Sequence, residues 1–74
     1  LTIAVNVSSR QLEDSAFVDD VARALHESGL PPRSLVLELT ESAIAKRPDA
    51  MGARLHALKA LGVRLAIDDF GTGY

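Results

Sequence analysis

The chain has 74 residues, a formal net charge of −2 and no cysteine. This length allows at most one small domain, and the lack of cysteine excludes a disulfide framework and a thiolate metal site. No apolar run reaches the roughly 20 residues of a membrane-spanning helix. The scattered lysine and arginine residues form no cluster that would indicate binding to DNA or RNA.

The first expected element is a strand over residues 1–8. Ile3, Val5 and Val7 alternate with small or polar residues, and such alternation places them on one face of a strand. Asn6 then falls on the opposite face, near the carboxyl end of the strand. We therefore expect one buried face and a polar side chain at the end.

The first expected helix covers residues 15–28 and follows a connection at residues 9–13. Its apolar residues recur at spacings of three and four, which is typical of a helix with one buried face. Asp14 or Ser15 is the expected N-cap. Gly29 is the expected end of the helix, because glycine readily takes the left-handed conformation that closes a helix.

The second expected strand covers residues 34–40. Its three leucines alternate with other residues, so they are expected to share one face, and Glu38 falls on the other face. Glu41 follows at the end of the strand. Glu38 is therefore a carboxylate within an otherwise apolar strand.

The second expected helix begins at Pro48, because proline suits the first turn of a helix, and it ends at Gly62. Arg54 and Lys59 are expected on its exposed side. The opposite side is expected to carry an apolar stripe that packs against the sheet. The residues of this stripe are Met51, Leu55, Leu58 and Leu61.

The third expected strand covers residues 63–67 and leads directly into Asp68 and Asp69. Its β-branched and apolar residues favour a buried strand, and Gly71 and Gly73 favour a turn after it. Two carboxylates at the end of an apolar strand are costly unless their charge is compensated, and buried charges are normally paired or bound to a metal. This segment is therefore the first indication of a functional site.

The order strand, helix, strand, helix, strand predicts an α/β fold with parallel strands and right-handed crossovers. Asn6 to Glu38 is a step of 32 residues and Glu38 to Asp68 is a step of 30 residues. Both steps are close to the ~31 residues per unit of a (β/α)₈ barrel. The carboxyl ends of parallel strands build the active sites of such folds. We therefore expect the three side chains to converge there.

Three oxygen-bearing side chains at one place predict a site for a hard cation such as Mg²⁺, Mn²⁺ or Ca²⁺. Asp69 would allow a second cation, and two metals roughly 3.5–4 Å apart suit phosphoryl displacement. Each residue also has an ordinary explanation. Asn6 is a common turn residue, Glu38 suits a solvated strand face, and an Asp pair suits a helix cap. Their repeated spacing favours a metal or phosphate site.

Two further motifs carry a weaker signal. Asp69-Phe70-Gly71 copies the magnesium triplet of protein kinases, but no glycine-rich loop, strand lysine or catalytic loop accompanies it. Gly71-Thr72-Gly73 lacks the third glycine of a dinucleotide-binding fingerprint. An unrelated α/β phosphate-binding module is therefore the more distant alternative.

Three segments of the chain resemble consecutive motifs of the bacterial EAL domain family. The resemblance covers the whole chain, and the last motif is the most specific. It implies a TIM-like (β/α)₈ barrel of about 250 residues, of which residues 1–74 would form about a third, with both ends truncated. The Glu-Ala-Leu signature would then lie upstream, and a lysine and a glutamate of the site would lie downstream. The motifs are Val5-Asn6-Val7-Ser8, Leu37-Glu38-Leu39-Thr40-Glu41-Ser42 and Asp68-Asp69-Phe70-Gly71-Thr72-Gly73-Tyr74.

The resemblance implies a metal-dependent phosphodiesterase that hydrolyses the second messenger cyclic di-GMP to the linear dinucleotide pGpG, with Mg²⁺ or Mn²⁺. It makes Asn6, Glu38 and Asp68 metal ligands. Asp69 would hold the second metal or its bridging water. Glu41 would fix the loop after the aspartate pair, so Asp69 and Glu41 are the expected catalytic residues. No substrate-binding residue is assigned, and the isolated chain is expected to be inactive.

A non-catalytic EAL-type receptor, which would bind cyclic di-GMP or a protein partner without hydrolysis, is the alternative function. The intact Asn6, Glu38, Asp68 and Asp69 favour the enzyme, because a receptor would often have lost one of them. The resemblance also implies sensor or GGDEF-type domains elsewhere in the parent protein. We expect a cytoplasmic domain, with any membrane anchor outside this stretch. A homodimer is possible, and no DNA or RNA partner is expected.

Overall fold

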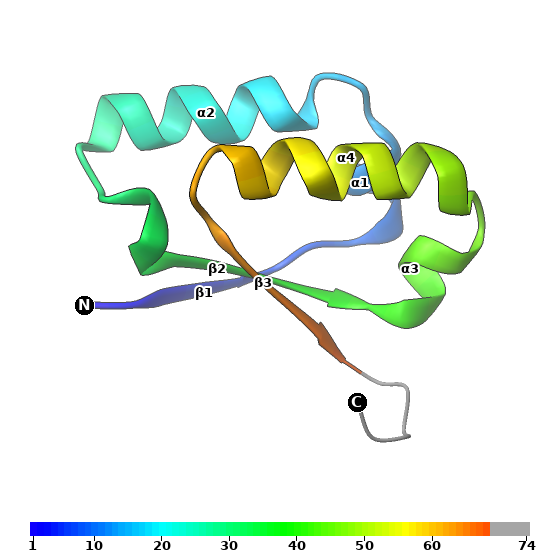
Figure 1. Ribbon diagram of the computed structural model, residues 1–74. Coiled ribbons are helices and arrows are strands. Elements are labelled where there is room, and N and C mark those ends of the chain that lie inside the picture. Colours follow the sequence, from blue (N-terminus) through cyan, green and yellow to red (C-terminus); the bar gives the residue numbers. More distant parts are fainter. Residues whose placement is uncertain (69–74) are drawn as a thin grey trace.

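The computed structural model describes residues 1–68 (Figure 1). The expected turn at Gly71 and Gly73 and the expected metal ligand Asp69 lie outside the described residues. No helix in the described part is long and apolar enough to cross a membrane. In chain order, the described elements are β1 (Ile3–Asn6), α1 (Ser9–Glu13), α2 (Phe17–Ser28), the 3₁₀ turn η1 (Pro32–Ser34), β2 (Leu35–Thr40), α3 (Glu41–Ala45), α4 (Pro48–Ala60) and β3 (Arg64–Asp68).

The three described strands form one parallel sheet in the order β1-β2-β3. Helices α2 and α4 contact each other and lie over one face of this sheet (Figure 1). Each of them belongs to a connection between neighbouring parallel strands, which is the arrangement of a βαβ unit. The predicted α/β class and the parallel β-α-β-α-β order are confirmed.

The core lies between the helical layer and the sheet. Its four fully buried large side chains come from three elements, two helices and one strand, so both layers contribute to it. Full burial of one such side chain contributes roughly 1.5–3 kcal/mol to stability. The leucines of β2 face this core, as the alternation of the strand predicted. The four fully buried residues are Leu12 of α1, Leu39 of β2, and Met51 and Leu58 of α4.

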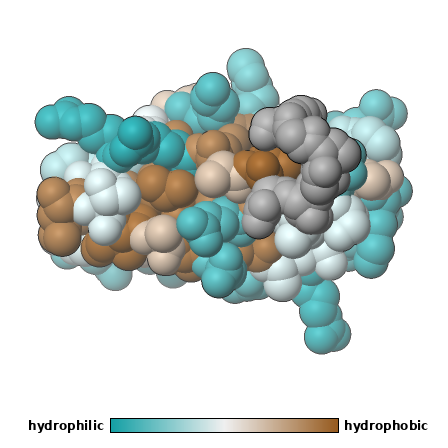
Figure 2. All heavy atoms as spheres, turned by 90° about the horizontal axis from the view of Figure 1, so that it is seen from below, coloured by the Kyte–Doolittle hydropathy of each residue, from teal (hydrophilic) through white to brown (hydrophobic). Residues whose placement is uncertain are grey.

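Strand β1 is shorter than the strand expected over residues 1–8, because it covers only Ile3–Asn6. Ile3 and Val5 were expected on a buried face, but their exposed fractions are 41% and 42%. The reason is that β1 is an edge strand of the described sheet. Val7 lies just beyond the strand and is buried. Figure 2 views the molecule from the sheet side, where apolar surface runs between polar groups.

Residues 9–13 form helix α1, so the expected connection at this place was wrong. Ser8 Oγ accepts a hydrogen bond from the Gln11 amide at 3.2 Å, and Gln11 Oε1 accepts one from the Ser8 amide at 3.0 Å. This reciprocal pair is a capping box, which satisfies two amide groups at the start of a helix. Leu12 then anchors the helix in the core.

Helix α2 begins at Phe17, and its N-cap is Ala16 instead of Asp14 or Ser15. Asp14 stabilises the turn before this helix, because its Oδ1 accepts a hydrogen bond from the Ala16 amide at 2.9 Å. Such an Asx turn redirects the chain between the two helices. Gly29 ends the helix with φ of 73°, as predicted.

Helix α3 follows β2 directly and was not predicted from the sequence. Thr40, the last residue of β2, is also the N-cap of α3, because its Oγ1 accepts a hydrogen bond from the Ala43 amide at 3.2 Å. Side-chain oxygens at this position satisfy free amides of the first turn. Glu41 is therefore the first residue of a helix and does not extend the strand.

Helix α4 begins at Pro48, as predicted, and buries Met51 and Leu58. Arg54 was expected on the exposed side, but it is partly buried. Its Nη1 donates a hydrogen bond to the carbonyl oxygen of Leu12. This contact joins α4 to α1 and satisfies a carbonyl group near the end of the short helix, where carbonyls lack partners within the helix.

Candidate functional site

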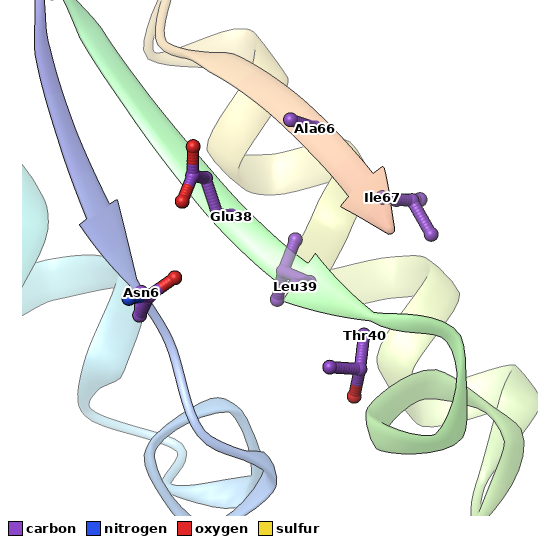
Figure 3. Close-up of a pocket in the computed structure, with 6 residues that line it drawn as sticks. All are labelled: Asn6, Glu38, Leu39, Thr40, Ala66 and Ile67. Carbon is purple, nitrogen blue, oxygen red and sulfur yellow. The ribbon is translucent and has the colours of Figure 1, made fainter. Parts of the chain in front are cut away.

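Asn6 and Glu38 are neighbours at the carboxyl ends of β1 and β2. The parallel register aligns Asn6 with Glu38, and it aligns Glu38 with Ala66 of β3. Because side chains alternate between the faces of a strand, these three residues share the face opposite Leu37 and Leu39. Figure 3 shows Asn6 and Glu38 on the same side of the sheet. One row across the sheet therefore carries an amide and a carboxylate.

A hollow of about 240 Å³ lies over this row (Figure 3). Ala66 is the smallest side chain of the row, so it leaves the space beside Glu38 open. Glu38 is partly buried and forms part of the wall of the hollow. The lining residues are Asn6, Glu38, Leu39, Thr40, Ala66 and Ile67.

The register also locates Asp68 at the level of the backbone. Asp68 is aligned with Thr40, two residues beyond the pair of Glu38 and Ala66. Two residues along a strand cover about 6.5 Å and return to the same face. Asn6, Glu38 and Asp68 therefore occupy positions on one face and at one end of the sheet. The side chain of Asp68 and the whole of Asp69 lie outside the described part of the structure.

Glu41 occupies a different place from the other predicted site residues. It is the exposed first residue of α3, and it does not line the hollow beside Asn6 and Glu38. The expected contact of Glu41 with the loop after Asp68 involves residues beyond the described ones. Within the described residues, the structure therefore brings Asn6 and Glu38 together and leaves Glu41 outside that pair.

Thr40 is a site residue that sequence reasoning missed. It lines the hollow, is aligned with Asp68 and caps the helix that begins with Glu41. One residue therefore links the strand ends to the start of α3. The available signal was a threonine directly before an acidic residue at the end of a strand, which is typical of a helix N-cap.

The donor atoms of this row fit a hard divalent cation. The amide oxygen of Asn6 and the carboxylate of Glu38 are ligands that Mg²⁺ and Mn²⁺ take. Neither side chain forms a hydrogen bond or an ion pair with another side chain among residues 1–67. The described residues contain no group of three or more His, Cys, Asp or Glu that could hold a metal ion. A metal here would therefore use the Asn6 amide and further oxygen ligands.

Comparison with known proteins gives a family match over residues 1–74, to the family described as EAL domain. The chain is 47% identical over 72 residues to a bifunctional diguanylate cyclase/cyclic di-GMP phosphodiesterase, MucR, from Pseudomonas aeruginosa, with 97% of this chain and 10% of that protein covered. It is 39% identical over 74 residues to a cyclic di-GMP phosphodiesterase from the same organism, with 100% of this chain and 13% of that protein covered. The chain thus spans about a tenth of the length of these relatives.

Comparison with solved structures gives matches to the same kind of protein. The PaMucR phosphodiesterase in complex with c-di-GMP superposes with a TM-score of 0.90 and is 46% identical, with 99% of this chain and 32% of that chain covered. The EAL domain of Mycobacterium smegmatis DcpA superposes with a TM-score of 0.87 and is 43% identical, with 100% and 33% covered. The chain therefore matches about a third of each solved chain.

Proposed function

Because the chain belongs to the EAL domain family, we propose that it is part of a phosphodiesterase domain that hydrolyses cyclic di-GMP to the linear dinucleotide pGpG. The relatives named as cyclic di-GMP phosphodiesterases and the solved complex with c-di-GMP support this substrate. The observation that carries the proposal is the row of Asn6 and Glu38, with Asp68 in register at the same end of the sheet. In the complete domain, residues 1–74 would form about a third of a (β/α)₈ barrel.

Asn6, Glu38, Asp68 and Asp69 are the proposed metal ligands of this domain, with Mg²⁺ or Mn²⁺ as the cation. When bound, such cations lower the pKa of water and offset the negative charge of the phosphodiester. Asn6 would contribute an amide oxygen, and the acidic residues would contribute carboxylate oxygens.

The sheet itself holds the first two ligands in place. The amide of Val7 donates a hydrogen bond to the carbonyl oxygen of Glu38 at 2.9 Å. This bond continues the ladder directly after Asn6, so β1 and β2 cannot slip relative to each other at the site without breaking it. Ligands that project from a paired strand are positioned more accurately than ligands on a loop. The chain's contribution to catalysis is therefore the placement of its oxygen atoms.

Glu41 is proposed to act by fixing the loop that follows Asp68 and Asp69, and Asp69 is proposed to hold the second metal ion or its bridging water. Thr40 supports Glu41, because its cap sets where α3 begins. Thr40 is also aligned with Asp68 in the register of β2 and β3. A change in the start of α3 would therefore shift Glu41 relative to the strand that leads into the aspartate pair.

The substitution Asp68→Asn in the complete parent domain tests the function. We expect turnover of cyclic di-GMP by the wild type with Mg²⁺, and at least a roughly hundredfold loss of kcat/KM in the variant, because even residues that only support metal ligands cost 10–100-fold when changed. Linear pGpG would be the product, detected by chromatography. Glu27→Gln is the matched control, since Glu27 is an exposed carboxylate on α2, far along the chain from the strand ends.

Three results of this experiment would contradict parts of the proposal. An Asp68→Asn variant with wild-type turnover would exclude Asp68 from the site. Binding of cyclic di-GMP by the wild type without hydrolysis would assign the receptor function instead. Full activity after metal removal with a chelator would exclude the metal dependence.

The parent protein is proposed to contain further signalling domains, of the sensor or GGDEF type. The chain covers only about a tenth of its named relatives, and one of them is named as both a diguanylate cyclase and a phosphodiesterase. A homodimer and a cytoplasmic location stay predictions.

A further inference from the structure

Arg54 of α4 forms a contact between two helices that the proposed hydrolysis does not use. Its side chain is partly buried, and its Nη1 donates a hydrogen bond to the carbonyl oxygen of Leu12 in α1. Among the described residues, the Arg54 side chain forms no other hydrogen bond and no ion pair. It lines a hollow together with Val18 and three alanines of α4, and no carboxylate lines that hollow. The guanidinium group therefore serves a backbone carbonyl and not an acidic side chain.

The Leu12 carbonyl depends on this contact. Leu12 is 0% exposed, so its backbone is shielded from water. The Asp14 amide donates to the Gln11 carbonyl at 3.1 Å, and no described backbone amide after α1 donates to the Leu12 carbonyl. A buried carbonyl without a partner costs about as much free energy as a lost hydrogen bond. Without the Arg54 donor, the end of α1 would therefore have to shift towards water.

A continuous series of hydrogen bonds connects Leu12 with the end of β1. The Leu12 amide donates to the Ser8 carbonyl at 3.0 Å. The Ser8 amide in turn donates to Gln11 Oε1 at 3.0 Å, within the capping box of α1. The Val7 amide donates to the Glu38 carbonyl at 2.9 Å. Both residues between β1 and α1 are thus held by their amides, and a movement of α1 would be passed on to the strand end.

We propose that Arg54 is a positioning residue for the metal site and that it acts through α1 on Asn6. The inference rests on the proposed function. The Val7 bond directly follows Asn6, so a shift of α1 would weaken this bond and with it the placement of the Asn6 amide oxygen. Arg54 belongs to the helical layer on one face of the sheet, whereas Asn6 and Glu38 share the other face (Figure 1). It therefore contacts neither the cation nor the substrate.

Hydrogen exchange at the Val7 amide, measured by NMR, tests this connection without metal or substrate. We expect Arg54→Met in the complete parent domain to speed this exchange by roughly threefold to tenfold, because the lost hydrogen bond makes local opening easier. Methionine keeps the apolar stem and lacks the donor. Arg54→Lys retains a donor and should restore most of the protection. Arg23→Met is the matched control, since Arg23 is an exposed arginine of α2 that pairs with Asp20.

Equilibrium binding of Mn²⁺ to the same variants tests the effect on the site. We expect Arg54→Met to weaken binding by roughly threefold to tenfold, which is less than the 10–100-fold cost of changing a residue bonded directly to a metal ligand. In an Asn6→Ala background it should have no further effect, because the ligand that it positions is absent. A purely structural role would lower the thermal midpoint without changing the metal affinity. Val21→Ala provides this comparison, because it removes buried apolar contacts of α2 and no hydrogen bond of α1.

The two measurements separate this inference from the proposed hydrolysis. Faster Val7 exchange and weaker Mn²⁺ binding by Arg54→Met, in a parent domain without turnover, would support the role of Arg54 and contradict the hydrolase. Unchanged Mn²⁺ affinity in Arg54→Met would overturn the inference and leave the hydrolase intact. Equal effects in Arg23→Met or Val21→Ala would also overturn it, because a loss of charge or of general stability would then explain them.

Discussion

At the residue scale, two glycines near the end of the chain have opposite constraints. Gly62 has φ of 99°, and a Cβ atom added there would lie 3.0 Å from Cβ of Pro32. Gly52 lies inside α4, and nothing lies within 4 Å of an added Cβ atom. Glycine is therefore required at the turn into β3, and it is only tolerated within the helix.

We expect Gly62→Ala to lower the free energy of unfolding of the parent domain by more than about 1 kcal/mol, because it combines backbone strain with a close contact. Gly52→Ala should raise it by about 0.5–1 kcal/mol, because alanine favours the helix. Urea denaturation measures both changes. Gly29→Ala is the control, since Gly29 has φ of 73° but no atom within 4 Å of an added Cβ. Equal losses for Gly29→Ala and Gly62→Ala would show that the contact with Pro32 costs nothing.

Asn6 and Glu38 could be located from the sequence because side chains of a strand alternate strictly between two faces. Their position in neighbouring strands followed from the repeated spacing and the parallel order. Thr40 could not be assigned in this way. Thr40 is important because it is both the last residue of β2 and the N-cap of α3. The periodicity of either element alone does not show that the two elements join at this residue.

At the element scale, the two five-residue helices α1 and α3 were the parts of the fold that the sequence pattern missed. A helix of little more than one turn is too short to show a repeat of three and four residues. Only the caps signal its presence, in Ser8 with Gln11 and in Thr40 before Glu41. The longer helices α2 and α4 were predicted because their apolar faces repeat several times.

The cap of α1 can be tested with Ser8→Ala. We expect the free energy of unfolding of the parent domain to fall by about 0.5–2 kcal/mol, because the Gln11 amide loses its partner. Thermal denaturation provides the measurement. Ser15→Ala serves as the control, since Ser15 is exposed and lies outside every described helix. If both substitutions have the same effect, the capping box contributes nothing beyond the loss of a surface hydroxyl.

At the scale of the whole molecule, helices cover one face of the sheet, and its two edge strands are partly exposed. Helices α2 and α4 protect one face, whereas the edge strands expose apolar side chains. Ile3, Val5 and Ile67 are each about two-fifths exposed. Unpaired strand edges are templates for pairing with another chain. These features suit a segment that is completed by neighbouring elements of a larger domain.

We expect a polypeptide of residues 1–74 alone to show no turnover of cyclic di-GMP, because it matches only about a third of the solved chains. It should also associate with rising concentration, since β1 and β3 are edge strands of the sheet that residues 1–68 form. A turnover assay together with light scattering measures both properties, and the complete parent domain is the control. A monomeric polypeptide with measurable turnover would contradict this expectation and would show that residues 1–74 contain all the groups that hydrolysis needs.

The strand order β1-β2-β3 follows the order of synthesis, and this affects how the protein folds. Each strand pairs with the strand made just before it, so Ile3 meets Leu35 and Val36 meets Arg64. A chain that leaves the ribosome can therefore complete one βαβ unit before the next is made. Because each closure spans only about thirty residues, loop entropy stays small. The pair of β1 and β2, which carries Asn6 and Glu38, can thus form before β3 with Asp68 joins the sheet.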